Sequence, residues 1–155
     1  MEKEELNVEE EYNKFKYKLP NFKDLDSEFE ISFIKDKPFL LRGIRRRITE
    51  KIILFCRVIE SLIYPTQGNI ITATESKNFD DKQKDKMGQI YRKLMTFERQ
   101  SLILDVDASD KGDVEYINEV FKYWGKLKKE MVNIVEIMKK SWFEEEEADK
   151  NNYFG

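Results

Sequence analysis

One apolar stripe constrains the fold of this chain more than any other feature. It lies between residues 38 and 64, PFLLRGIRRRITEKIILFCRVIESLIY. Large apolar residues recur there every three or four positions, which places them along one face of an α-helix. More apolar side chains beside the stripe make the second half apolar nearly all round, as in a central bundle helix or a dimer interface. The stripe consists of Leu41, Ile44, Ile48, Ile52, Phe55, Ile59 and Leu62.

Two later segments, residues 80–104 and 113–143, carry similar helical patterns. Only six glycines and three prolines occur in 155 residues, which argues against a sandwich or barrel with many tight turns. The sequence therefore predicts an all-α fold, a three-helix bundle of long antiparallel helices. The expected buried stripe of the third helix is Val114, Ile117, Phe121, Trp124, Met131, Val135, Met138 and Trp142, with Lys128 interrupting it.

Composition divides the chain into an N-terminal arm (1–37), a helical bundle (38–144) and an acidic C-terminal tail (145–155), which we expect to be frayed. The arm holds eleven acidic residues, seven lysines and scattered aromatics. It can add a short fourth element by packing its aromatics on the bundle, or it can order only on contact with a partner. Residues 64–79 are expected to form a linker, partly ordered by Ile70 and Ile71.

The first long helix begins with a cluster of four arginines, in which Arg42 and Arg46 lie opposite the apolar stripe and Arg45 and Arg47 lie on its two flanks. Arg57 follows further along, on the same side as Arg42 and Arg46. Cations are disfavoured at a helix N-terminus, so a negative group should lie nearby. One interpretation is a phosphate-binding surface, since arginine binds phosphate bidentately. The other is an internal ion-pair face that meets the arm's acidic residues, Asp24, Asp26, Glu28 and Glu30.

The charge at the end of the third long helix is also unfavourable, because glutamates follow residue 143 where cations are preferred. In an up-down-up bundle this acidic end and the basic start of the first helix lie at opposite poles. An antiparallel dimer or a long flexible tail could bring them together.

The composition excludes several kinds of site. The chain has no histidine, which removes histidine bases and most zinc sites. It also has no glycine-rich phosphate loop. Asp105, Asp107 and Ser109 match the first ligand positions of a calcium loop, but Asp110 and Tyr116 stand where glycine and glutamate are needed. We therefore expect no enzyme, no cofactor and no metal site.

The sequence also gives expectations about location. The single cysteine, Cys56, indicates a reducing compartment, and no stretch suits a signal peptide or a membrane span. We expect a cytoplasmic protein that does not enter a membrane.

Together these features predict a non-enzymatic helical interaction module, which self-associates as a homodimer or docks as an adaptor or subunit of a larger complex. The alternative is an RNA- or DNA-binding subunit that uses the arginine cluster. The sequence pI of about 5.3 weighs against the alternative, since nucleic-acid-binding domains are more often strongly basic.

Overall fold

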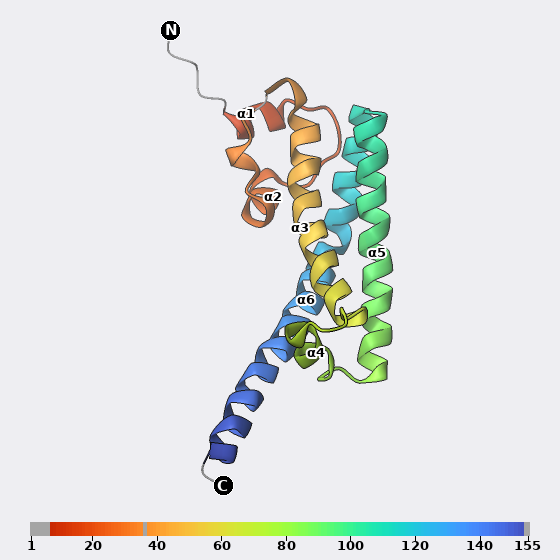
Figure 1. Cartoon of the computed structure of the whole chain (residues 1–155). Helices are drawn as coiled ribbons and strands as arrows, with labels where there is room; N and C mark the ends of the chain where they lie inside the picture. The colour runs from red at the N-terminus through yellow and green to blue at the C-terminus, as the bar shows by residue number, and fades with distance from the viewer. Residues whose placement is uncertain (1–6, 36, 154–155) are drawn as a thin grey trace. The chain divides into compact units, whose positions relative to one another are not determined.

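The computed structural model describes residues 7–35 and 37–153, which form six α-helices, two short 3-10 helices and no strand (Figure 1). The predicted all-α class is confirmed, and three long helices give a bundle-like arrangement. The long helices are α3 (Leu40–Ile63), α5 (Asp81–Val106) and α6 (Asp110–Tyr153). The short elements are α1 (Val8–Asn13), α2 (Phe22–Phe29), η1 (Ile31–Phe33), η2 (Lys37–Phe39) and α4 (Ile70–Ser76).

The chain divides into two compact units, and each long helix contributes to both. The first unit comprises residues 1–53 and 95–124, and the second comprises residues 54–94 and 125–155. We describe each unit by itself. The division into arm, bundle and tail stays a prediction.

In the first unit the three long helices present buried residues at alternating spacings of three and four. This repeat is typical of helices that pack along a coiled-coil-like seam. Three of the seam residues are polar or charged: Arg45, Ser101 and Asp113. The seams consist of Leu41, Arg45, Ile48 and Ile52 from α3, Phe97, Ser101 and Leu104 from α5, and Asp113, Ile117, Val120 and Trp124 from α6.

The described part of the N-terminal arm, which begins at residue 7, is folded onto the long helices of the first unit. Asn7 and Asn21 cap α1 and α2, and Glu30 ends α2 in the left-handed conformation. The indole of Trp124 donates a 2.8 Å hydrogen bond to Glu28, and its ring lies 4.7 Å from that of Phe29. Of the two interpretations of the arm, the structure shows the packed one.

In the second unit a short helix replaces the expected linker. Asn69 caps α4 through the backbone N–H groups of Ile71 and Thr72, and Ser76 donates a 2.8 Å hydrogen bond to the Leu62 carbonyl. The prediction that Ile70 and Ile71 order this segment is wrong, because both side chains are exposed. Capping and one buried hydroxyl hold it instead.

The observed bounds of α3 and α5 agree with the predicted segments, but those of α6 do not. This helix starts at Asp110, where the Ser109 hydroxyl accepts a 3.0 Å hydrogen bond from the Gly112 N–H. It continues to Tyr153, so the predicted end near residue 143 is wrong; the fraying of the tail stays a prediction, and its last two residues, 154–155, lie outside the described residues. Glu144, Glu146 and Glu147 consequently lie before the last turn, where the opposing helix dipole is weaker.

Candidate functional site

Arg45 is the predicted site residue whose position differs most from expectation. Its side chain is 0% exposed, and each guanidinium nitrogen is bound. Nε donates to Asp113 Oδ1 at 2.6 Å, and Nη2 donates to Asp105 Oδ1 at 2.7 Å. Nη1 donates to the carbonyl and the hydroxyl of Ser101 at 2.9 and 2.7 Å. The Arg45 side chain is therefore buried among these acceptors and is not accessible to a phosphate.

Arg45, Ser101 and Asp113 form a polar layer across the three seams of the first unit. Two further hydroxyls extend it, since Thr49 Oγ1 lies 2.8 Å from Ser101 Oγ and 2.9 Å from Tyr116 Oη. Among the described residues no buried side-chain nitrogen or oxygen lacks a hydrogen-bond partner. A fully satisfied layer of this kind is compatible with a stable core, whereas a partly satisfied one is not.

The two carboxylates that bind Arg45 respond differently to their surroundings. The hydrogen bond from Arg45 holds the pKa of Asp105 below its ordinary value, with smaller help from Arg46. Burial raises the pKa of Asp113 above its ordinary value, although the Arg45 guanidinium pulls it the other way. The partly exposed carboxylate is therefore the more firmly ionised of the two.

These contacts correct the expected partner of the arginine face. The acidic partners that the structure shows for Arg45 and Arg46 are Asp105 and Asp113, whereas in the arm Glu28 accepts from Trp124 and Asp26 accepts from the Ser32 N–H. The acceptors come from the end of α5 and the start of α6. A basic helix start thus meets the acidic end of a neighbouring helix, and each offsets the other's unfavourable terminal charge.

The remaining arginines do not form one surface with Arg45. Arg46 is largely exposed and shares Asp105 with Arg45 at 3.2 Å. Arg42 lies over the Phe39 ring, 4.7 Å from its centroid, and Arg47 is half-buried. Arg57 is exposed and belongs to the second unit. The predicted cluster is therefore divided between one buried structural residue and four more accessible ones.

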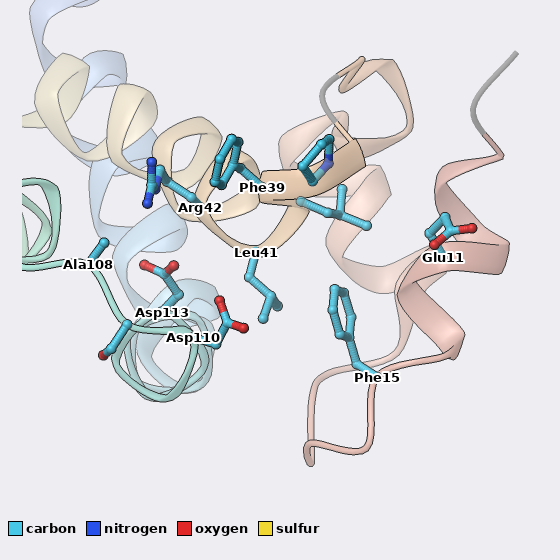
Figure 2. A pocket seen from close by; sticks show the side chains of 11 residues that line it. Glu11, Phe15, Phe39, Leu41, Arg42, Ala108, Asp110 and Asp113 are labelled. Atoms are coloured by element: carbon cyan, nitrogen blue, oxygen red, sulfur yellow. The ribbon is translucent and has the colours of Figure 1, made fainter.

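A pocket of about 380 Å³ adjoins this region in the first unit (Figure 2). Leu41 from α3 and Phe15 from the segment after α1 give it apolar walls. Its charged lining is Arg42 with the carboxylates of Glu11, Asp110 and Asp113. Glu11 is paired with Lys14 and Asp113 with Arg45, so Asp110 balances Arg42 and the pocket has no excess positive charge that would favour a phosphate group.

The residues of the possible calcium loop have other structural roles. Asp105 lies within α5 and binds Arg45 and Arg46, and Ser109 caps α6. Within residues 7–35 and 37–153, no group of three acidic or thiol side chains could hold a metal ion.

The second unit contains an exposed line of α6 residues, two of which, Val135 and Trp142, the sequence interpretation placed in the core. The buried residues of α6 there are Leu127, Met131, Ile134 and Ser141, with half-buried Met138 between them, and we call these five the inner seam. One residue further along runs a second line with the same spacing, which we call the outer seam. The outer seam consists of Lys128, Val132, Val135, Lys139, Trp142 and Glu146, all of them exposed.

The burial predicted for Val135 and Trp142 is therefore wrong. Val132, Val135 and Trp142 are 52%, 47% and 43% exposed, and neighbouring Phe143 is 64% exposed. Leu127 takes the core position beside Lys128, so the inner seam has no lysine interruption. A helix that is apolar on two adjacent faces usually contacts two partners, and the inner seam uses only one face.

Comparison with known proteins found no match among protein-family models, curated proteins or solved structures. Over the described residues, every helix is too short or too polar to cross a membrane.

Proposed function

We propose that this chain is a non-enzymatic helical interaction module that associates with a second copy of itself through the outer seam of α6. One observation carries the proposal: beside the packed inner seam lies an exposed line with the same spacing, whose central residues include Val132, Val135 and Trp142. Tryptophan and phenylalanine are enriched in protein interfaces, and Trp142 and Phe143 lie on or beside this line.

The exposed residues supply the driving force for such an association. Burying them removes apolar surface from water, at about 25 cal/mol per Å². The seam from Lys128 to Glu146 is about 27 Å long at 1.5 Å per residue. Two such faces give an interface at the small end of the known range, so we expect weak, concentration-dependent association.

Light scattering coupled to size-exclusion chromatography tests this function over a dilution series. We expect a mass of 18.7 kDa in dilute solution and a rise toward twice that value as the concentration increases. A mass that stays at the monomer value up to millimolar protein would overturn self-association.

The structure weakens the support for RNA or DNA binding. Arg45 is occupied by Asp113 and Asp105, and the pocket beside Arg42 has no excess positive charge. An electrophoretic shift at low salt that disappears with Arg42→Glu and Arg46→Glu would favour nucleic-acid binding over the proposed module.

A further inference from the structure

We infer that the two copies pair antiparallel along the outer seam, with Lys128 of one helix facing Glu146 of the other. This inference rests on the proposed self-association and adds its orientation and register. Two features of α6 carry it, the distribution of charge along the helix and the order of residues in the seam.

Charge along the second-unit part of α6 changes sign near Trp142. Residues 126–140 contain five lysines and two glutamates, whereas residues 144–147 are all glutamates. A parallel pair would place the acidic stretch of one copy against the acidic stretch of the other. An antiparallel pair places it against the partner's lysines, which is the complementary arrangement.

The order of residues along the outer seam also suits antiparallel pairing. When Lys128 faces Glu146, the same register pairs Val132 with Trp142 and Val135 with Lys139. The two-fold axis then passes near residue 137, and every contact occurs twice, as an isologous interface requires. In this register each tryptophan packs on a valine, and each ion pair closes one end of the seam.

Two of the seam's polar residues can join such an interface at low cost. Lys139 can lay its methylene stem along Val135 while its ammonium group stays in water. Glu146 currently pairs with Lys150 at 3.4 Å, and both side chains are more than half exposed. Exposed pairs contribute little, so the loss of the Lys150 pair costs Glu146 little.

Disulfide trapping tests the register with the full chain. The variants Lys128→Cys and Glu146→Cys, one of them carrying a mass tag, are mixed in equal amounts and oxidised. Antiparallel pairing brings the two new thiols together, so we expect the mixed covalent dimer to exceed each homodimer several-fold. Wild type is the matched control, since its cysteine, Cys56, is buried and should form no covalent dimer.

The outcomes separate this inference from the proposed function. A dominant 128–128 or 146–146 dimer would show parallel pairing and overturn the antiparallel register, while leaving self-association intact. A sample that is dimeric by light scattering but gives no crosslink would place the contact on another surface and overturn the register too. A sample that is monomeric at every concentration would overturn both proposals.

Discussion

Arg45 is a charged residue at a core position, and its burial has a defined energetic meaning. Removing a guanidinium from water costs several kcal/mol, which its carboxylates and Ser101 must offset. Such a layer stabilises little compared with apolar packing, but it disfavours any register that leaves the arginine unpaired. We interpret the polar layer as the feature that fixes how α3, α5 and α6 align in the first unit.

Replacing Arg45 alone should therefore be costly. Arg45→Met leaves Asp113 buried without its cation, and we expect the free energy of unfolding to fall by about 3–5 kcal/mol. Urea denaturation followed by circular dichroism measures this change.

The neighbouring arginine supplies a matched control. Arg46→Met removes a largely exposed partner of the same Asp105 and should cost less than about 1 kcal/mol. Adding Asp113→Leu to Arg45→Met should recover much of the loss, because an apolar pair replaces an ionic one. Equal losses for Arg45→Met and Arg46→Met would show that the buried pair has no special role.

Asp105 gives a pH dependence whose sign follows from its lowered pKa. Below the ordinary aspartate pKa of 3.8, the folded carboxylate stays ionised while the unfolded one binds a proton. The stabilisation that ionised Asp105 provides is therefore fully present above that pH and is lost as the pH falls. Asp113, with its raised pKa, contributes in the opposite direction.

We expect Asp105→Asn to flatten the acid side of the stability curve. Between about pH 5 and pH 3 the variant should lose less unfolding free energy than wild type, because it has no carboxylate at position 105 that acid could protonate. Urea titrations at several pH values measure both curves. Two parallel curves would mean that the Asp105 carboxylate is not held by Arg45.

The sequence predicts the arginine cluster but not the fate of its members. Helical spacing places Arg45 beside the apolar stripe, and charged residues are seldom fully buried unless paired. The pairing residues lie more than fifty positions later, and no local pattern links them to Arg45. An alternating three-four spacing that includes Arg45, Ser101 and Asp113 was the available signal, because it puts polar residues at core positions.

At the scale of single elements, α6 shows why helix existence is easier to predict than helix orientation. Its apolar residues occupy two adjacent lines, and a helix of 44 residues drifts between them when a repeat of 3.6 is assumed. The predicted stripe takes Met131 and Met138 from the inner seam but Val135 and Trp142 from the outer seam. Only the packing of neighbouring helices decides which line is buried.

Asn118 and Trp124 of α6 both donate hydrogen bonds to the arm, and the contact of Trp124 can be tested separately. Trp124→Phe keeps an aromatic ring beside Phe29 but removes the hydrogen bond to Glu28. We expect a loss of at least about 1 kcal/mol in urea denaturation and faster proteolysis within residues 14–21. Trp142→Phe, made at an exposed tryptophan and measured in dilute solution, should change neither quantity appreciably. Unchanged proteolysis in Trp124→Phe would mean that other contacts hold the arm.

At the scale of the whole molecule, the charges near the helix ends differ in whether a group within the same chain offsets them. The arginines at the start of α3 are offset within the first unit by Asp105 and Asp113. The glutamates after Trp142 follow a lysine-rich stretch. In an antiparallel dimer the glutamates of one copy could neutralise the lysines of the other. This difference in charge balance, together with the exposed outer seam, supports self-association through α6.

Sedimentation velocity of two matched variants tests directly whether α6 mediates self-association. Trp142→Glu places a charge on the outer seam, whereas Ile103→Glu makes the same change at an exposed apolar residue of α5 in the first unit. We predict that wild type and Ile103→Glu form the same concentration-dependent dimer, and that Trp142→Glu stays monomeric with unchanged helicity. A dimer that persists in Trp142→Glu, or is lost equally in Ile103→Glu, would contradict association through α6.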